Sequence, residues 1–309
     1  MTMPRILVSP RSITSAGGHP SLEKLSAAGY EVVFTTAGKQ PSEEELLDLL
    51  PGCIGFLAGV ENISRNVLEA SGELKVISRN GTGINNVDLN AAKQLNIKVC
   101  NTPGANARGV AELTIAHLFS LARHLPLIDR EIKAGKWVRK KGIELKGRTL
   151  GLIGCGMIGK EVGLLALGLG MKVVAYDEFS SAVFTDSPDF KYVDLSELLS
   201  YSDFISFHCP VPDDRKPIFD KEMVEKVKTG VMIINTARGE LVDSDAVLEG
   251  INKGKIRGMA VDVFESEPPE DDRLTGNDQI ICSSHIGGYT EESVDNAMDA
   301  AVDNLLNNL

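Results

Sequence analysis

The stretch TLGLIGCGMIGKEVGLLALGLGMKVVAYD, residues 149–177, determines the expected fold of this chain. It begins with an apolar run typical of a buried strand, passes through a GxGxxG turn made by Gly154, Gly156 and Gly159, and ends a second apolar run at Asp177. The three glycines allow a tight turn, a close approach of the backbone to a pyrophosphate, and close packing of helix on strand. The helix N-terminus then faces the negative charge. This unit predicts a dinucleotide-binding site.

Asp177 indicates which dinucleotide binds. It lies 18 residues after Gly159, where a carboxylate accepts hydrogen bonds from both hydroxyls of the adenine ribose and repels a 2′-phosphate. Arginine, the usual partner of that phosphate, is absent from residues 178–181. A purely structural turn is the alternative for a GxGxxG motif alone, but strand, helix and acid agree here. We therefore expect NAD rather than NADP.

Short β-branched runs alternate with helix-length amphipathic stretches on both sides of this unit. This is the pattern of a parallel sheet covered by helices on both faces, so we expect an α/β protein with two doubly wound parallel-sheet domains. The expected strands are 6–9, 31–34, 54–58, 74–78 and 97–100 in the first domain, and 149–154, 172–177, 203–210, 230–237, 258–264 and 279–285 in the second.

Helix signals lie between and after these runs. Pro41, followed by acids, opens an expected helix over 41–50, Gly29 closes another, and Thr290 with acids just inside caps the last one. The segment after Gly104 repeats apolar residues every three or four positions, which predicts a long helix with one buried face. That face carries Val110, Leu113, His117, Leu118, Leu121 and Leu125.

The charge balance bears on partners and location. Lys and Arg number 32 and Asp and Glu 43 among the 309 residues, so the net charge is −11 and the pI is near 5.0. Polyanions bind cationic surfaces, so neither nucleic acid nor an anionic membrane is expected as a partner. No apolar run approaches the roughly 18 residues of a membrane span, and the first residues are typical of a strand rather than a secretion signal. We expect a cytoplasmic protein.

The cysteines are widely spaced and form no CxxC pair, and no histidine neighbours them at zinc-site spacing. They are expected to be reduced and mostly buried, without a disulfide or a metal site. The five are Cys53, Cys100, Cys155, Cys209 and Cys282.

Hydride transfer from an alcohol carbon needs an acid/base near the oxygen and a cation that binds the substrate. Three segments near the carboxyl ends of expected strands offer such groups: NTARGELVD with Arg238, DVFESEPP with Glu265 and Glu267, and SSHIGG with His285. Ligands of open α/β sheets bind at these ends, so the groups are expected to converge. Taken singly, Arg238 is more often an ion-pair partner, Glu267 an exposed loop charge and His285 a satisfied histidine at a strand end.

NTARG, DVFESEP and SHIGG, in this order downstream of GCGMIG, resemble the D-isomer-specific 2-hydroxyacid dehydrogenase family. The resemblance covers essentially the whole chain, and residues 79–92 and 135–151 are most similar to the phosphoglycerate dehydrogenases of that family. It implies a Rossmann NAD-binding domain, residues 103–286, inserted into a smaller flavodoxin-like substrate domain, residues 1–102 and 287–309. The length matches a short form without regulatory domains.

The same resemblance implies the catalytic roles. His285 is the general acid/base, Glu267 is its carboxylate partner, and Arg238 binds the substrate carboxylate and polarises the reacting carbonyl. The residue types suit these roles, because a histidine titrates near neutrality, a carboxylate fixes its tautomer, and a guanidinium matches a carboxylate and keeps its charge. The implied reaction interconverts a D-2-hydroxy acid and its 2-keto acid with NAD. The substrate pair that the resemblance favours is 3-phosphoglycerate and 3-phosphohydroxypyruvate, as in serine biosynthesis.

Further contacts are implied by the resemblance. Backbone amides of the loop LAGVEN bind the substrate carboxylate and Arg79 favours a phosphate, whereas Ala58 stands where some phosphoglycerate dehydrogenases have another arginine. Met157 stands where the family often has an arginine. The expected substrate-binding residues are Ala58, Gly59, Val60, Arg79, Asn80 and Gly81. The expected cofactor-binding residues are Thr82, Gly154, Gly156, Met157, Ile158, Gly159, Asp177, His208, Cys209, Thr236, Ala237, Asp262, Gly287 and Gly288.

Two other functions stay open from the sequence. One is a dehydrogenase or reductase for glycerate, hydroxypyruvate or a sulfonated analogue. The other is an NAD(H)-responsive binding protein without activity, since one relative of this family is a transcriptional corepressor. The intact Arg238, Glu267 and His285 favour an enzyme. A homodimer is expected from the long helix after Gly104 and the loop around Trp137, which resemble the dimer contact of the family.

Overall fold

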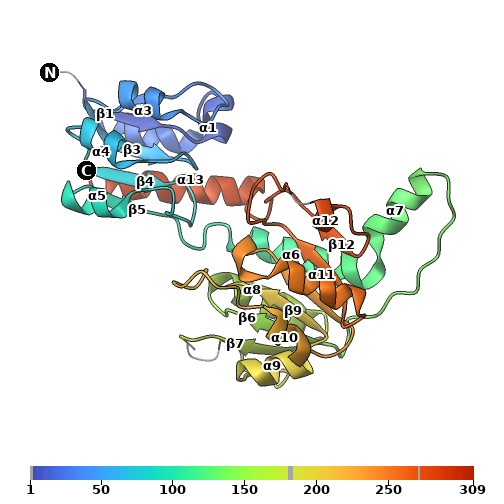
Figure 1. Cartoon of the computed structure of the whole chain (residues 1–309). Helices are drawn as coiled ribbons and strands as arrows, with labels where there is room; N and C mark the ends of the chain where they lie inside the picture. The colour runs from blue at the N-terminus through green and yellow to red at the C-terminus, as the bar shows by residue number, and fades with distance from the viewer. Residues whose placement is uncertain (1–2, 180–183, 271) are drawn as a thin grey trace. The chain divides into compact units, whose positions relative to one another are not determined.

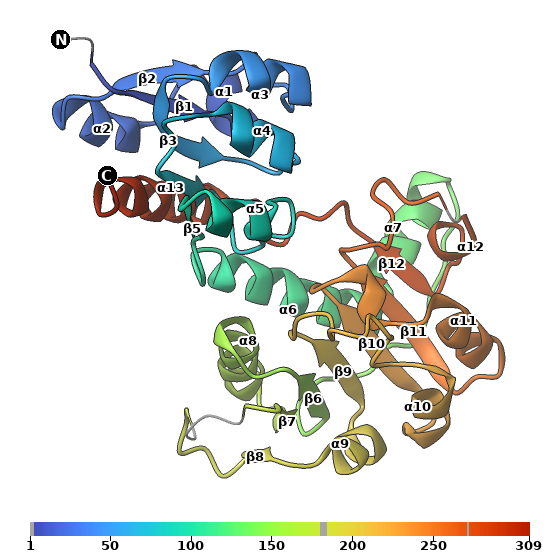
Figure 2. The same cartoon turned by 60° about the vertical axis from the view of Figure 1, so that its left-hand side comes forward.

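The computed structural model describes residues 3–179, 184–270 and 272–309. The chain divides into two compact units (Figure 1, Figure 2). Unit 1 is Met1–Asn106 with Glu291–Leu309, and unit 2 is Ala107–Thr290.

Unit 1 is built on a five-stranded sheet in the order β2-β1-β3-β4-β5, in which all neighbouring strands are parallel. Leu7 of β1 packs in a core with side chains of α3, α4 and α5, whereas its neighbours Ile6 and Val8 pack on the other face with α1, α2 and α13. The strands are β1 (Arg5–Val8), β2 (Glu31–Phe34), β3 (Cys53–Ala58), β4 (Val76–Arg79) and β5 (Lys98–Cys100). The helices are α1 (Arg11–Ser15), the 3-10 turn η1 (Pro20–Leu22), α2 (Glu23–Ala27), α3 (Glu43–Leu49), α4 (Arg65–Ala70), α5 (Leu89–Gln94) and α13 (Glu291–Leu306).

Unit 2 is built on a seven-stranded parallel sheet in the order β12-β11-β10-β9-β6-β7-β8. Numbered within the unit, this order is 7-6-5-4-1-2-3, a doubly wound topology in which the winding reverses between β6 and β9. The strands are β6 (Thr149–Ile153), β7 (Lys172–Tyr176), β8 (Phe190–Tyr192), β9 (Phe204–Phe207), β10 (Val231–Asn235), β11 (Ile256–Val261) and β12 (Ile280–Cys282). The helices are α6 (Ala107–Arg123), α7 (Leu125–Lys133), α8 (Met157–Gly168), α9 (Leu195–Tyr201), α10 (Lys221–Lys226), the 3-10 turn η2 (Gly239–Leu241), α11 (Ser244–Asn252) and α12 (Asp272–Thr275).

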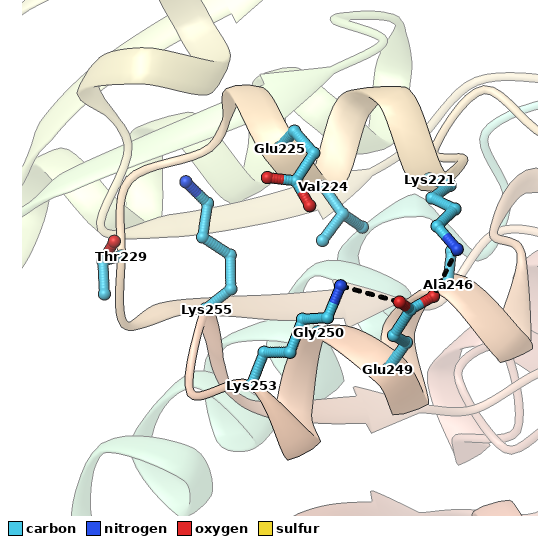
Figure 3. A pocket seen from close by; sticks show the side chains of 9 residues that line it. All are labelled: Lys221, Val224, Glu225, Thr229, Ala246, Glu249, Gly250, Lys253 and Lys255. Atoms are coloured by element: carbon cyan, nitrogen blue, oxygen red, sulfur yellow. Dashed lines mark ion pairs between the residues drawn. The ribbon is translucent and has the colours of Figure 1, made fainter.

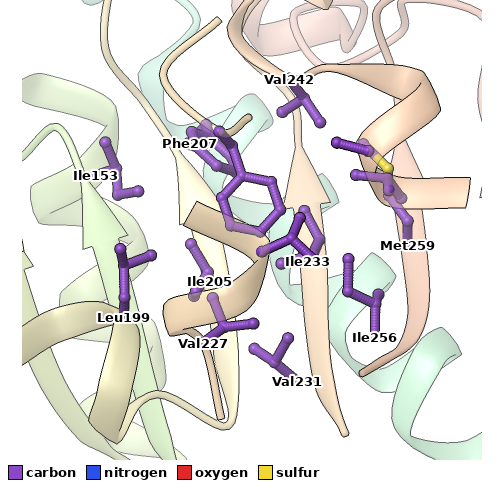
Figure 4. Packing of buried hydrophobic residues seen from close by; sticks show 14 of the residues in the cluster. Ile153, Leu199, Ile205, Phe207, Val227, Val231, Ile233, Val242, Ile256 and Met259 are labelled. Carbon is purple, nitrogen blue, oxygen red and sulfur yellow. The ribbon is translucent and has the colours of Figure 1, made fainter. Parts of the chain in front are cut away.

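Both faces of this sheet are buried, because successive residues of each strand enter opposite cores. Ile233 of β10 packs under α9, α10 and α11, while its neighbours on the strand, Met232 and Ile234, pack under α6 and α8. Figure 4 shows the first of these cores, in which the rings of Phe207 and Phe219 meet edge to face with centroids 5.8 Å apart. These continuous apolar runs are typical of central parallel strands.

The expected α/β class with two parallel, helix-covered sheets is confirmed. Three local expectations were wrong. Leu125 does not lie on the buried face of the long helix, because α6 ends at Arg123 and Leu125 begins α7 with 53% of its surface exposed. Pro41 does not open α3; Ser42 is the N-cap, because its hydroxyl accepts a hydrogen bond from the amide of Glu45 and proline has no such side-chain acceptor. The edge strand β8 was missed, since three residues in a polar context give no clear period.

Two smaller observations complete the fold. No disulfide links the cysteines; Cys53 and Cys155 are buried, Cys100 and Cys209 half-buried, and Cys282 exposed. Within the described ranges, no helix combines the length and the apolar character that crossing a membrane requires.

Candidate active site

The dinucleotide turn lies between β6 and α8. Gly154 follows the strand at φ +94°, and a Cβ there would lie 2.6 Å from the carbonyl carbon of His208. A Cβ at Gly159 would lie 2.3 Å from the carbonyl oxygen of Gly154, so turn and helix pack too closely for a side chain. A Cβ at Gly156, the N-cap of α8, would meet nothing within 4 Å. The turn is therefore closed towards the protein and open at the N-terminus of α8, where Met157 and Ile158 begin the helix.

Asp177 follows β7 and is tied to this turn. Its Oδ2 accepts a hydrogen bond of 2.6 Å from the amide of Cys155, and its Oδ1 accepts one of 2.8 Å from the amide of Phe179. Two backbone amides thus fix the carboxylate beside the glycine turn. Residues 180 and 181, part of the segment that lacks arginine, lie outside the described residues.

His208 and Cys209 follow β9 and lie against the same turn. The imidazole Nε2 of His208 is 2.8 Å from the hydroxyl of Ser206, and its buried Nδ1 has no hydrogen-bond partner among the described residues. Burial lowers the pKa of His208 to about 3 and raises the pKa of the Cys209 thiol to about 11. Both groups are neutral near pH 7. A buried ring nitrogen without a partner beside the turn fits a dinucleotide that supplies the missing polar contact.

Arg238 lies in a turn just after β10. The buried amide of Asn235 shapes this turn, since its Nδ2 donates to the carbonyl of Arg238 (2.8 Å) and its Oδ1 accepts from the amide of Ala237 (3.1 Å). The half-buried guanidinium of Arg238 donates through Nη1 to the carbonyl of Ala237 (2.6 Å). A Cβ at Gly239 would lie 2.3 Å from the backbone of Phe264. The structure therefore brings the NTARG and DVFESEP segments into direct contact.

Glu267 and His285 form a pair. The Nδ1 atom of His285 is 2.7 Å from Oε2 of Glu267, while Oε1 accepts a hydrogen bond of 3.1 Å from the amide of Phe264. The side chains are 52% and 36% exposed, so the pair is open to a small ligand. No hydrogen bond to Nε2 of His285 occurs within the described part of the chain. The pair can therefore hold a proton at Nδ1 and exchange one at Nε2.

Asp262, at the end of β11, organises the turn that carries His285. Its carboxylate is 1% exposed and accepts from the amides of Ile286 (2.9 Å) and Gly287 (2.8 Å) and from the hydroxyl of Ser283 (2.6 Å). Its backbone carbonyl accepts from the amide of His285 (2.8 Å). His285 has a φ of +54°, a left-handed conformation that costs on the order of 1–3 kcal/mol in a residue with a side chain. The hydrogen bonds around Asp262 hold the backbone in that conformation.

The substrate-binding loop expected in unit 1 is held by a buried acid. Glu61 is 1% exposed, and its Oε1 accepts from the amide of Gly59 (2.8 Å) and from the hydroxyl of Ser9. The amide of Gly59 therefore already has an acceptor. Val60 is 50% exposed, and its amide donates no hydrogen bond within the described residues.

In the neighbouring segment of unit 1, the backbone amides of Asn80 and Gly81 are also hydrogen-bonded within the protein. The amide of Asn80 donates to the carbonyl of Ala58 (2.8 Å), and the amide of Gly81 donates to the hydroxyl of Thr102 (3.0 Å). The guanidinium of Arg79 folds back onto the carbonyl of Asn80, and the carbonyl of Thr82 accepts from the side-chain amide of Asn101 (2.7 Å). Arg79 is half-buried at the end of β4.

Comparison with known proteins identifies the family of this chain. Residues 115–287 match the family model described as D-isomer specific 2-hydroxyacid dehydrogenase, NAD binding domain. The chain belongs to this family. It is 42% identical over 257 residues to the hydroxypyruvate reductase of Thermotoga maritima, which covers 81% of this chain and 83% of that protein. It is 39% identical over 277 residues to the D-3-phosphoglycerate dehydrogenase of Archaeoglobus fulgidus, which covers 88% of this chain and 52% of that protein. The chain thus spans about half the length of that second relative.

The fold is also shared with solved members of the family. The NAD complexed form of a D-isomer specific 2-hydroxyacid dehydrogenase from Lactobacillus delbrueckii ssp. bulgaricus superposes with a TM-score of 0.81 at 25% identity, covering 98% of this chain and 96% of that one. The protein is an NAD-dependent oxidoreductase of this family. The open space at Gly156, the fixed carboxylate of Asp177 and the unpartnered Nδ1 of His208 are the features of this dehydrogenase that fit the cofactor.

A groove of 180 Å³ lies elsewhere on unit 2, between α10 and α11 (Figure 3). Glu249 pairs there with Lys221 and Lys253, each at 2.7 Å, and these two cations lower its pKa to about 2. Thr229 and Lys255, also in its lining, precede β10 and β11. The groove is therefore at the amino ends of the strands, whereas ligands of doubly wound sheets bind at the carboxyl ends. It is not part of the candidate active site.

Several residues that shape this site were missed from the sequence. Asn235 and Gly239 set the Arg238 turn, Ser283 bonds Asp262, and Glu61 holds the loop of unit 1. Asn235 directly precedes the TARG motif and Gly239 ends it, so both were visible as motif neighbours. The role of Glu61 depends on Ser9, which lies 52 residues away in the sequence. Among the described residues, no group of three or more His, Cys, Asp or Glu side chains is arranged to hold a metal ion.

Replacing Asp177 by Asn tests the cofactor preference. We expect NADH to bind roughly 10- to 100-fold more weakly, since hydrogen bonds to a charged acceptor contribute about 1.5–3 kcal/mol. NADPH affinity should fall less or rise, because the repulsion of the 2′-phosphate is removed. Titration of both cofactors by nucleotide fluorescence measures the ratio, with Asp189→Asn, an exposed acid before β8, as the matched control. An unchanged NADH to NADPH ratio in Asp177→Asn would contradict the assignment.

The burial of His208 predicts that the free energy of unfolding depends on pH. Because burial lowers its folded pKa to about 3, the folded chain keeps it neutral between pH 6.5 and 3 while the unfolded chain takes up a proton. The free energy of unfolding of the cofactor-free protein should therefore decline as the pH falls through this window, by about 1.4 kcal/mol per pH unit for this one histidine. Urea unfolding at pH 7, 6 and 5 measures the slope, which should be shallower in His208→Asn. Equal slopes would show that His208 is not buried in its neutral form.

Proposed function

We propose that Arg238, Glu267 and His285 carry the proton and substrate chemistry of the reaction, in which a D-2-hydroxy acid and its 2-keto acid are interconverted. The observation that carries this assignment is the contact of 2.7 Å between Nδ1 of His285 and Oε2 of Glu267, on a turn fixed by Asp262. A carboxylate at Nδ1 favours the tautomer with the proton there, so Nε2 keeps a lone pair. That lone pair accepts the hydroxyl proton in oxidation, and the imidazolium returns it in reduction.

The remaining roles follow from charge. NAD, bound at the glycine turn, supplies the hydride acceptor. Glu267 compensates the positive charge that His285 gains when it takes the substrate proton, and the amide of Phe264 keeps that carboxylate in place. Arg238 offers a fork-shaped cation to the substrate carboxylate and draws electron density from the adjacent carbonyl, which favours hydride addition to that carbon in the reducing direction.

We propose 3-phosphohydroxypyruvate and 3-phosphoglycerate as the substrate pair, and serine biosynthesis as the pathway. Arg79 supports this proposal, since it is a half-buried cation in the segment of unit 1 that is most similar to the phosphoglycerate dehydrogenases. The relative from Archaeoglobus fulgidus bears that name, and it matches 88% of this chain.

Hydroxypyruvate is the second candidate. Two observations favour it: Ala58 provides no second cation for a phosphate, and the chain spans 83% of the hydroxypyruvate reductase from Thermotoga maritima. The two candidates differ only at the substituent on C3, so they share the proposed roles of Arg238, Glu267 and His285. They are distinguished by the response of each substrate to the loss of a cation.

Arg79→Gln provides that distinction. If Arg79 binds a phosphate, kcat/KM for 3-phosphohydroxypyruvate should fall roughly 10- to 100-fold, the loss expected for a charge-assisted hydrogen bond, while that for hydroxypyruvate stays within about threefold. NADH oxidation at 340 nm with a panel of 2-keto acids measures both. Arg65→Gln, an exposed arginine of α4 in the same unit, is the matched control. Equal losses for both substrates would refute phosphate recognition by Arg79.

His285→Asn tests the acid/base role itself. Asparagine tolerates the left-handed conformation at this position, so the turn should persist while the proton-exchanging group is lost. We expect kcat to fall on the order of 100-fold or more with the Kd for NADH nearly unchanged. Glu267→Gln should give a smaller loss, because the imidazole remains but loses its charged partner. Turnover by His285→Asn at the rate of the unaltered protein would exclude the proposed mechanism.

We also propose that the dehydrogenase is a cytoplasmic homodimer that binds neither nucleic acid nor membrane. Support for the dimer comes from the region around α7, in which no residue is buried and Ile132 is 49% exposed. Trp137, in the loop that follows, is 84% exposed. Large apolar side chains exposed together are typical of an interface. Sedimentation equilibrium at micromolar concentration should give a mass near 66 kDa, about twice the 33.2 kDa of one chain, and a monomer would refute the proposal.

A further inference from the structure

α6 carries two polar side chains on its buried face that the mechanism above does not use. Thr114 and His117 are 0% and 5% exposed, and their spacing of three residues places them on the same side of the helix. The sequence pattern predicted only that His117 lies on a buried stripe. Burial lowers the pKa of His117, so the ring is neutral. A buried polar group costs free energy unless it is hydrogen-bonded, so the partners of these two residues indicate what they do.

His117 bonds the turn that carries His285. Its Nε2 is 3.0 Å from the hydroxyl of Ser283, and that hydroxyl is 2.6 Å from Oδ1 of Asp262. A hydroxyl has one proton, and the shorter contact to a carboxylate takes it. His117 must therefore be the donor to Ser283, through the tautomer with the proton on Nε2. The result is a directed chain of hydrogen bonds from the helix to the acid that holds the His285 turn.

Thr114 bonds the segment that carries Arg238. Its hydroxyl donates to the carbonyl of Val110 (2.9 Å), the usual bond of a threonine to its own helix. It therefore accepts from the hydroxyl of Thr236, at 3.0 Å. Thr236 precedes Arg238 by two residues, just as Ser283 precedes His285 by two. One helix face thus makes equivalent contacts with the two segments that bear the proposed cation and the proposed acid/base.

The packing around these contacts leaves little room for the His285 turn to relax. A Cβ at Gly287 would lie 3.1 Å from Oδ2 of Asp262, and 3.4 Å and 3.6 Å from the side chains of Val110 and Leu113 on α6. The turn is therefore pressed against the same helix that bonds it. A change in the hydrogen bond between His117 and Ser283 therefore acts on Asp262. Asp262 in turn binds the backbone amides of Ile286 and Gly287.

We propose that Thr114 and His117 are positioning residues, which fix the Arg238 and His285 segments relative to each other through Thr236 and through Ser283 with Asp262. Neither residue is assigned contact with substrate or cofactor. The inference rests on the proposed roles of Arg238 and His285. It adds a requirement: side chains outside the reacting groups set the geometry in which a proton and a substrate carboxylate are held, and errors of about 1 Å in such geometry cost on the order of 100-fold in rate.

Variants of His117 test the proposal in the full-length protein. His117→Leu removes the hydrogen bond but keeps an apolar side chain of similar size, whereas His117→Gln keeps an amide that reaches Ser283. We expect kcat with the best 2-keto acid of the panel to fall on the order of 10- to 100-fold in His117→Leu and to recover to within about threefold of the unaltered protein in His117→Gln. The Kd for NADH should change less than threefold in both.

The matched control is Leu118→Ala, the next residue on α6, which is fully buried and forms no side-chain hydrogen bond. It should lower Tm at least as much as His117→Leu while leaving kcat unchanged, which separates positioning from general destabilisation. Ser283→Ala removes the same hydrogen bond from the segment after β12. This variant tests the positioning role if His117→Leu does not fold. Thr114→Val should also lower kcat, and the double variant with His117→Leu should lose less than the product of the two single losses, because both residues set one geometry.

The outcomes distinguish a failure of the positioning role from a failure of the proposed function. If the unaltered protein reduces a 2-keto acid and His117→Leu and Ser283→Ala do so equally fast, the positioning role is refuted and the proposed function stands. If kcat follows Tm through all variants, Leu118→Ala included, these residues serve stability alone and the inference fails. If the unaltered protein binds NADH but reduces no 2-keto acid, the proposed function fails, and the positioning role that rests on it fails with it.

Discussion

The geometry of the candidate active site depends on the hydrogen bonds that the buried carboxylate of Asp262 accepts. Asp262 receives two backbone amides and one hydroxyl from the turn after β12, and its backbone carbonyl receives the amide of His285. A carboxylate that is 1% exposed is expensive to bury unless such donors surround it, so the turn and the acid stabilise each other. The same bonds keep His285 in a left-handed conformation that its side chain would otherwise disfavour. From that position the imidazole meets Glu267 through Nδ1, and its side chain is 52% exposed.

The histidines show how one residue type serves different purposes in this fold. His208 lies against the glycine turn, and burial keeps it neutral across the physiological range. His117 is neutral for the same reason and acts as a hydrogen-bond donor within unit 2. His285 is 52% exposed and has the carboxylate of Glu267 on one nitrogen, so it alone of these three combines access to a ligand with an acidic partner. Environment, rather than residue identity, separates the two buried histidines from the one that we propose exchanges protons.

The sequence predicted the parts of this protein whose signals are local. The glycines, the strand before them and Asp177 lie within one continuous stretch, and the structure forms the expected β6–α8–β7 unit there, with the Asp177 carboxylate bonded to the turn. Every strand except the edge strand β8 was predicted, because the apolar runs of these strands enter two cores at once. The contact between Glu267 and His285 was expected from family resemblance, and the two side chains do meet.

What the sequence did not predict depends on hydrogen bonds between distant segments. Ser283 and His117 are 166 residues apart, and Thr114 and Thr236 are 122 apart, so no local period could pair them. Asp262 was expected to contact the cofactor, but in the described structure its oxygens are taken by the protein's own amides and a hydroxyl. Likewise the amide of Gly59, expected to bind substrate, is bonded to Glu61. A motif shows which residues gather near a site, whereas the folded chain decides which atoms remain free.

The proposed roles of Arg238, Glu267 and His285 are tested most directly by a crystal structure of the protein with NADH and a non-reactive analogue of a 2-keto acid, such as oxalate. We expect Nε2 of His285 within about 3.2 Å of an oxygen of the analogue, Nδ1 still bonded to Glu267, and the guanidinium of Arg238 on the carboxylate of the analogue. An analogue bound beside the nicotinamide with the imidazole of His285 turned away, or with its Nδ1 detached from Glu267, would contradict these roles.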